Sequence, residues 1–260
     1  MIYQKVVLIG AGRVAHHLAK AINHSGRKIV QVYSRHLGNA RELASPHRVA
    51  FTDDLSNLDA SADIYIIAVS DDAIAGVANQ LVVADKMVVH TSGSTPMNVL
   101  NPASSNHGVL YPLQSFAFNT DIDFKKVPLC IEAADPKTEE NLISFSRSIS
   151  NDVRRINSDT RLQIHIAAVF ANNFTNFMYL MAQEILSEGK VDFDILMPLI
   201  EETTRKLKDQ QPQEAQTGPA RRADIGVIQK HLGHLKDHPE KQEIYKMLSQ
   251  FIQEHFNQKK

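Results

Sequence analysis

The stretch Val6-Val7-Leu8-Ile9-Gly10-Ala11-Gly12-Arg13-Val14-Ala15 decides the fold of this 260-residue chain. Its first four residues are a continuous apolar run, which is typical of a buried parallel strand. The G-x-G-x-x-A pattern that follows opens a helix predicted over Val14–Ser25, and strand, glycine turn and helix in this order form a dinucleotide-binding fingerprint. We therefore expect Gly10, Ala11, Gly12, Arg13 and Val14 to hold a pyrophosphate at the helix N-terminus. The alternative is a glycine turn in an α/β domain that binds no ligand.

The end of the second predicted strand, Lys28–Tyr33, indicates which nucleotide binds. An NAD-binding domain usually has an acidic residue here, whereas this chain has Ser34-Arg35-His36. Arg35 can pair with a 2′-phosphate and Ser34 can add a neutral hydrogen bond, so NADP(H) is the predicted cofactor. The missing carboxylate also disfavours an S-adenosylmethionine site. The alternative is a solvated loop with a surface arginine and histidine.

Composition and charge exclude several classes of partner. The chain is 43% hydrophobic and 22% charged, and its net charge of -1 provides no basic surface for nucleic acid. No apolar run approaches the length of a membrane span, and the first strand leaves no room for a signal peptide. We expect small-molecule partners, no nucleic acid, no membrane and a cytoplasmic location. The single cysteine, Cys130, is expected to be buried and inert.

Strands and helices alternate through the first part of the chain, which predicts an α/β fold with a Rossmann-type parallel sheet. Polar residues follow the strands predicted over 62–69 and 87–90, and the carboxyl ends of parallel strands lie at one edge. Val69, Ser70 and Ser92 are therefore candidate cofactor contacts. Further strands are predicted near 28–33, 49–51, 109–111, 128–132 and 152–156.

The second part is predicted to be all helical, with helices over 161–186, 193–208 and from 224 to the end. Turns at Gln210–Pro212 and Thr217–Pro219 separate them. The predicted domains are therefore a Rossmann NADP-binding domain over 1–156 and an all-helical domain over 157–260.

The long helix carries a candidate polar pocket. At 100° per residue, one stripe holds His165, Asn172, Asn176, Tyr179 and Gln183, and the helix has a third asparagine at Asn173. Asparagine is a poor residue for a helix interior, so three of them indicate a compensating ligand site. A solvated face is the alternative, although the stripe has no Lys, Glu or Arg. Phe170, Phe174, Phe177 and Met181 lie on the opposite face, which we expect to pack into the core of the helical domain.

Two loops add candidate substrate contacts. Adjacent arginines in Thr217–Asp224 could clamp an acidic group, and we assign this role to Arg221, although Asp224 could simply cap the next helix. Gln114 follows a strand in a proline-containing loop and could line the cleft. The twelve histidines lack metal-ligand spacing, so no metal site is expected.

Together these segments resemble the Rossmann-like proteins that carry the C-terminal domain DUF2520 and are described as NADP oxidoreductases. These are similar in layout to pyrroline-5-carboxylate reductases, hydroxyisobutyrate-type dehydrogenases and deazaflavin-dependent NADP reductases. The resemblance implies that the helical domain forms a homodimer and closes the site over the nicotinamide. The chain departs from the family at Ala223, where a glycine is expected, and at Tyr111, where a histidine is commoner.

The sequence therefore predicts an NADP(H)-dependent oxidoreductase that transfers a hydride to or from a small carbonyl or imine substrate carrying an acidic group. His165 is the candidate acid/base because imidazole titrates near neutral pH, and Asn172 or Asn173 would orient it or polarise the substrate. Gln114, Asn176 and Arg221 are the predicted substrate contacts. The alternatives are a non-catalytic NADP(H)-binding redox sensor and a methyltransferase-like enzyme.

Overall fold

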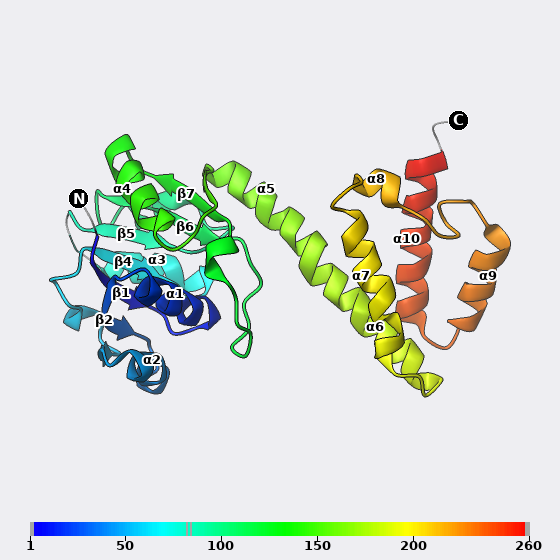
Figure 1. The fold of residues 1–260 in the computed structure, drawn as a ribbon, viewed down its shortest axis with the longest axis horizontal. Helices are drawn as coiled ribbons and strands as arrows, with labels where there is room; N and C mark the ends of the chain where they lie inside the picture. The colour runs from blue at the N-terminus through cyan, green and yellow to red at the C-terminus, as the bar shows by residue number, and fades with distance from the viewer. Residues whose placement is uncertain (1–2, 82, 84, 258–260) are drawn as a thin grey trace. The chain divides into compact units, whose positions relative to one another are not determined.

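The computed structural model describes residues 3–81, 83 and 85–257. The chain divides into two compact units, one up to Asn173 and the other from Phe174 onward. The first unit contains the sheet, and the regular elements described for the second unit, up to residue 257, are all helices (Figure 1). The predicted α/β domain followed by an all-helical part is confirmed, while the predicted boundary at residue 156 stays a prediction.

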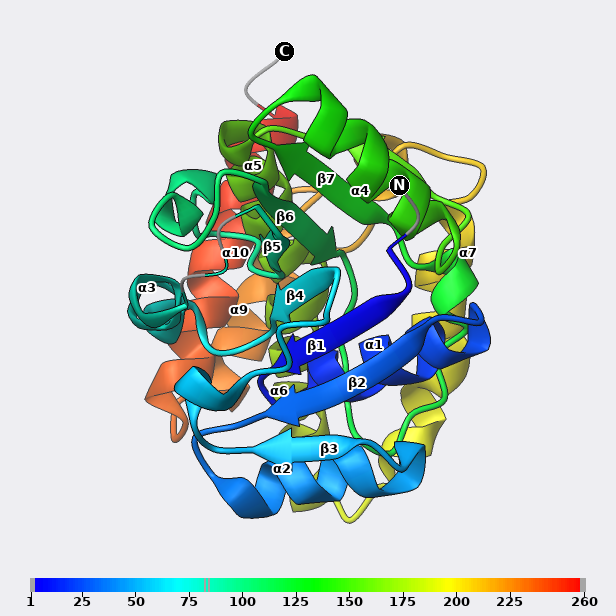
Figure 2. The ribbon, with the colours of Figure 1, turned by 90° about the vertical axis from the view of Figure 1, so that its left-hand side faces the viewer.

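The sheet has eight strands in the order β3-β2-β1-β4-β5-β6-β7-β8 (Figure 2). All neighbours pair in parallel except β6 and β7, which are antiparallel. The chain between β6 and β7 has no α-helix, and without a crossover helix it returns antiparallel. The strands are β1 (Lys5–Ile9), β2 (Lys28–Tyr33), β3 (Ala50–Thr52), β4 (Ile64–Ile67), β5 (Met87–His90), β6 (His107–Pro112), β7 (Leu129–Ala133) and β8 (Val153–Arg155).

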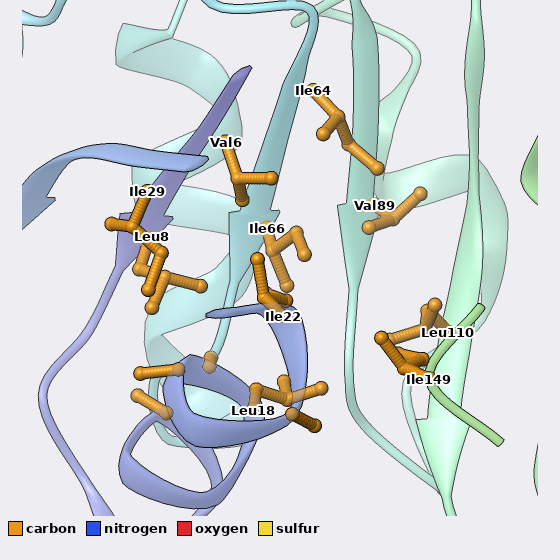
Figure 3. Packing of buried hydrophobic residues seen from close by; sticks show 14 of the residues in the cluster. Val6, Leu8, Leu18, Ile22, Ile29, Ile64, Ile66, Val89, Leu110 and Ile149 are labelled. Carbon is orange, nitrogen blue, oxygen red and sulfur yellow. The ribbon is translucent and has the colours of Figure 1, made fainter. Parts of the chain in front are cut away.

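Helices cover both faces of the sheet because successive strand residues point to opposite sides. On β1, Val6 and Leu8 join one hydrophobic cluster with α1, whereas Val7 and Ile9 join a second cluster with α3. Figure 3 shows the first cluster, in which Leu18 and Ile22 of α1 lie against the strands. The helices of the Rossmann part are α1 (Arg13–His24), α2 (Leu37–Ala44), α3 (Asp71–Gln80) and α4 (Pro136–Arg147). Short 3₁₀ turns are η1 (Ser45–His47), η2 (Leu55–Asn57), η3 (Met97–Leu100) and η4 (Phe124–Lys126).

The predicted long helix consists of three segments. It runs through α5 (Ser158–Ala168), a π-helix η5 (Val169–Phe174) and α6 (Thr175–Glu188). The remaining elements are η6 (Phe193–Leu196), α7 (Met197–Lys206), α8 (Pro212–Ala215), α9 (Ile225–His234) and α10 (Pro239–Asn257). The helix predicted from residue 224 is therefore two helices, because Pro239 has no N–H to continue a helix and begins a new one instead.

Two smaller expectations can be compared with the structure. Cys130 is a buried free cysteine on β7, as predicted, and burial raises the pKa of its thiol. None of the helices in the described ranges has the length and apolar character to cross a membrane.

Candidate functional site

The glycine turn after β1 has the geometry that a pyrophosphate requires. Gly10 has φ +115°, and a Cβ there would lie 2.2 Å from the carbonyl oxygen of Ala68, so only glycine fits. Gly12 precedes α1 without any side-chain cap, and a Cβ on it would meet nothing within 4 Å. α1 begins at Arg13 and has no acidic residue in its first turn, so no carboxylate of that turn competes for its first N–H groups. This turn fits a dinucleotide phosphate.

The end of β2 has an exposed arginine beside a buried hydroxyl. Ser34 is buried, and its Oγ accepts a hydrogen bond from the His36 backbone N–H at 3.4 Å. Arg35 is exposed. This arrangement leaves the guanidinium accessible to a phosphate in solution, in agreement with the predicted cofactor.

The ends of β4 and β5 are linked by side chains. Ser94 Oγ donates to Asp71 Oδ2 at 2.5 Å, which joins the loop after β5 to the start of α3. Ser92 Oγ accepts from the backbone N–H groups of Ser94 and Thr95, at 3.1 and 2.9 Å. Ser70 is the N-cap residue of α3 but makes no side-chain cap there. The Ser92 hydroxyl therefore stabilises the backbone of its own loop, while the Ser70 hydroxyl does not cap α3.

A cavity of about 570 Å³ lies beside these loops within the first unit. It brings together four of the predicted site residues: Gln114, His165, Asn172 and Asn173. The other lining residues are Tyr111, Leu113, Ser115, Ala167, Ala168, Val169 and Ala171. The predicted residues Asn176 and Arg221 belong to the second unit.

The π-helix explains why both asparagines line this cavity. Hydrogen bonds in a π-helix join residues five apart, so a stripe drawn at 100° per residue does not continue through η5. The segment brings Asn172 and Asn173 to the cavity together, where the predicted stripe held only Asn172. π-helical turns are frequent at functional sites, since they present side chains that a regular helix would turn away.

The opposite face of the long helix differs from the prediction. Phe170, Phe174 and Phe177 are 65%, 49% and 47% exposed, so they do not pack into the core of the helical part. The expectation was wrong because a helical stripe of phenylalanines identifies an apolar face but not what covers it.

Tyr111, which the sequence indicated only as a departure from the family, contacts His165. Its Oη lies 3.2 Å from His165 Nδ1. Burial raises the pKa of the Tyr111 phenol to about 12, and the charges of Cys130 and Asp71 act in the same direction. The only sequence signal for this contact was that Tyr111 ends the strand predicted over 109–111, in the same sheet as the strand that precedes Ser92.

A buried arginine, which the sequence analysis missed, fixes the start of α5. Arg161 is 1% exposed, and its Nη1 donates to Glu132 Oε2 at 2.5 Å. Its Nη2 donates to the Thr95 carbonyl at 2.6 Å and to Ser158 Oγ at 3.1 Å. Burial, and after it the Arg161 charge, lowers the pKa of the nearby His90 to about 4.

The segment that holds Arg221 has its own local structure. The Arg221 guanidinium lies 4.5 Å from the centroid of the Phe256 ring, and Asp224 accepts from the Val227 N–H at 3.2 Å as the cap of α9. Ala223 has φ +55°, a conformation that favours glycine, which is the residue expected there.

Within the described residues, no three His, Cys, Asp or Glu side chains gather to hold a metal ion.

Two family models match the chain. NADP oxidoreductase coenzyme F420-dependent matches residues 5–93, and the domain of unknown function DUF2520 matches residues 127–252. Among curated proteins, none matches the sequence.

Solved structures share the whole architecture. A Bacteroides fragilis protein assigned as an NADP oxidoreductase is 41% identical, with a TM-score of 0.90, and the match covers 97% of this chain and 98% of that one. An imine reductase from Myxococcus stipitatus in complex with NADP+ is 16% identical, with a TM-score of 0.69 and coverage of 96% and 93%. A 1-pyrroline-5-carboxylate reductase from Streptococcus pyogenes is 12% identical, with a TM-score of 0.63 and coverage of 96% and 98%. The chain therefore belongs to the Rossmann-like NADP oxidoreductases that carry a DUF2520 domain, and NADP(H) is its cofactor.

Proposed function

We propose that this protein reduces a small imine or carbonyl compound with NADPH, or catalyses the reverse oxidation. The observation that carries this proposal is a cavity that gathers a histidine and two asparagines beside the loops that follow the central strands. Two of the proteins that share the fold are named an imine reductase and a pyrroline-5-carboxylate reductase, which favours a C=N or C=O substrate.

The cofactor would be held by four loops at the carboxyl edge of the sheet. Backbone groups of Gly10–Val14 would bind the pyrophosphate, and Ser34 with Arg35 would bind the 2′-phosphate. Val69, Ser70 and Ser92 would contact the nicotinamide half from the ends of β4 and β5. The bound cofactor supplies or accepts the hydride.

The residues of the cavity would supply the proton, polarise the double bond and orient the substrate. Reduction of a C=O or C=N bond needs a proton at the heteroatom, and His165 would donate it. Asn172 or Asn173 would donate an N–H to the same heteroatom and polarise the bond. Gln114 would fix the substrate's orientation.

The substrate would carry an acidic group that Arg221 binds. A guanidinium stacked on an aromatic ring, as Arg221 is on Phe256, keeps its planar donor edge available for a carboxylate. The chain would act as a homodimer formed through the helical unit, where exposed apolar side chains such as Ile195 and Leu199 would be covered by the partner.

Turnover with the wild type and a His165→Gln variant tests the proposal. We expect NADPH consumption, followed by absorbance, with at least one member of a panel of cyclic imines and keto acids. His165→Gln should lower the rate about 100-fold and leave NADPH affinity unchanged, because the variant loses only the proton donor. Tight NADPH binding without turnover of any panel member would instead support the redox sensor, and equal rates would remove His165 from the mechanism.

A further inference from the structure

The Tyr111–His165 contact joins segments that are far apart in the chain. Tyr111 is the last but one residue of β6 and His165 lies on α5, yet Oη and Nδ1 are 3.2 Å apart. Their ring centroids are 6.0 Å apart and the ring planes meet at 78°. The phenol therefore approaches the imidazole at its Nδ1 edge, where a hydrogen bond forms, and does not stack on the face of the ring.

The backbone of Gly93 closes the space around this contact. A Cβ at position 93 would lie 2.8 Å from His165 Nδ1 and 2.8 Å from Tyr111 Cζ. No side chain can stand there without displacing one of the two rings. Nδ1 is thus enclosed by the phenol and by the loop after β5, which leaves Nε2 as the ring nitrogen for a substrate in the cavity that His165 lines.

The protonation state of the imidazole decides the direction of the hydrogen bond. Burial raises the pKa of Tyr111 to about 12, so the phenol keeps its proton at neutral pH. A phenol both donates and accepts, so it can donate to Nδ1 of a neutral imidazole and accept from Nδ1–H of an imidazolium. One residue thus supports both states that an acid/base histidine must adopt.

We propose that Tyr111 is a positioning residue that engages Nδ1 of His165, so that Nε2 exchanges the proton with the substrate. This inference rests on the proposed function, in which His165 is the proton donor. In the reduction, the substrate carbon gains a hydride from NADPH, which is oxidised to NADP+, and the substrate heteroatom gains the Nε2 proton of the imidazolium. The neutral imidazole left by this transfer has its proton on Nδ1, hydrogen-bonded to Tyr111 Oη, until proton exchange with water returns it to the resting Nε2–H tautomer, in which the phenol donates to Nδ1.

Nitrogen NMR of protein labelled with ¹⁵N-histidine tests the contact without a substrate. At a pH where the imidazole is neutral, we expect His165 to be the Nε2–H tautomer alone, with its signals assigned by their loss in His165→Gln. In Tyr111→Phe the two ring-nitrogen shifts should move toward each other, as the Nδ1–H form becomes populated. An Nδ1–H tautomer in the wild type, or unchanged shifts in Tyr111→Phe, would overturn the proposal.

The chain offers matched controls for this measurement. The helical unit has a second tyrosine–histidine contact, in which His231 Nδ1 lies 2.7 Å from Tyr245 Oη. Because this pair does not include His165, Tyr245→Phe should leave the His165 signals unchanged. Gly93→Ala should change them as Tyr111→Phe does, because its methyl group separates the rings. Gly76→Ala should leave the His165 signals unchanged, because a Cβ at position 76 meets nothing within 4 Å.

A double-mutant cycle on NADPH turnover then tests the role in the reaction. We expect kcat/KM to fall about tenfold in Tyr111→Phe and about 100-fold in His165→Gln. The double variant should be no slower than His165→Gln, because Tyr111 acts only through that histidine. If the double variant instead shows the product of the two single decreases in kcat/KM, Tyr111 does not act through His165 and the positioning role is overturned. An intact NMR contact without any turnover would overturn the proposed function alone.

Discussion

At the scale of single residues, His90 makes stability depend on pH in the acid range. It is fully buried, and its pKa is lowered to about 4 from the ordinary 6.5. In the unfolded chain His90 becomes protonated near pH 6.5, whereas in the folded chain it becomes protonated only near pH 4. The free energy of unfolding therefore falls as the pH drops through this window. The contribution is about 3 kcal/mol at most.

Replacing His90 with asparagine should remove this slope. Asn Oδ1 can accept the Ser92 N–H bond that His90 Nδ1 accepts at 3.2 Å, while it has no proton to gain. Urea unfolding at a series of pH values from 7 to 4 should give a flatter stability curve for His90→Asn. His24→Asn, an exposed position, is the control and should keep the wild-type slope, and an equally steep curve for His90→Asn would exclude His90 as the cause.

Ala223 is strained by its backbone. An alanine with φ +55° costs the folded state about 1–2 kcal/mol of backbone strain. A glycine removes this strain, but it offsets part of the gain because it has more conformational freedom in the unfolded chain. We expect Ala223→Gly to raise the free energy of unfolding by about 0.5–1 kcal/mol, measured by urea titration. A decrease would mean that the methyl group makes contacts worth more than the strain.

At the scale of elements, a buried ion pair joins α5 to β7. Replacing Arg161 with methionine leaves the Glu132 carboxylate unpaired and should cost about 3–5 kcal/mol of stability in thermal or urea unfolding. The double variant Arg161→Met/Glu132→Leu should recover most of that loss, since it leaves no buried charge. Arg155→Met breaks an exposed pair with Glu139 and should cost less than about 1 kcal/mol. Equal losses in the two single variants would contradict the anchoring role.

Elements could be predicted from the sequence where a local signal existed. Apolar runs indicated the parallel strands. The helix α4 was not predicted, although Asp135-Pro136 before it is a recognisable start signal, and the Asp135 side chain accepts from the Thr138 N–H at 3.1 Å. The reversed direction of β7 could not be predicted, because an apolar run is the same for either direction. The π-helix was also hidden, since residues 169–174 fit a regular helix by composition.

At the scale of the whole molecule, the candidate site was predictable only in part. His165 and Asn172 were indicated by their helical spacing, Asn173 by being a third asparagine in a helix interior, and the glycine turn by its motif. The contact of His165 with Tyr111 spans 54 positions, and that of Arg161 with Glu132 spans 29. No local pattern encodes such pairs, because the sheet order and the path of α5 determine them.

The exposed apolar surface of the helical unit gives the last prediction. Ile195 and Leu199 are 62% and 64% exposed on neighbouring elements, which is costly for a monomer in water. If a second copy covers them, sedimentation equilibrium should give twice the chain mass of 29.1 kDa. The Ile195→Glu/Leu199→Glu variant should sediment as a monomer, because two carboxylates would be buried without partners in the interface. Phe51→Glu places the same charge on the exposed side chain of β3 and should remain dimeric. A wild-type monomer would rule out the dimer, whereas a dimer that survives the double substitution would place the interface on another part of the helical unit.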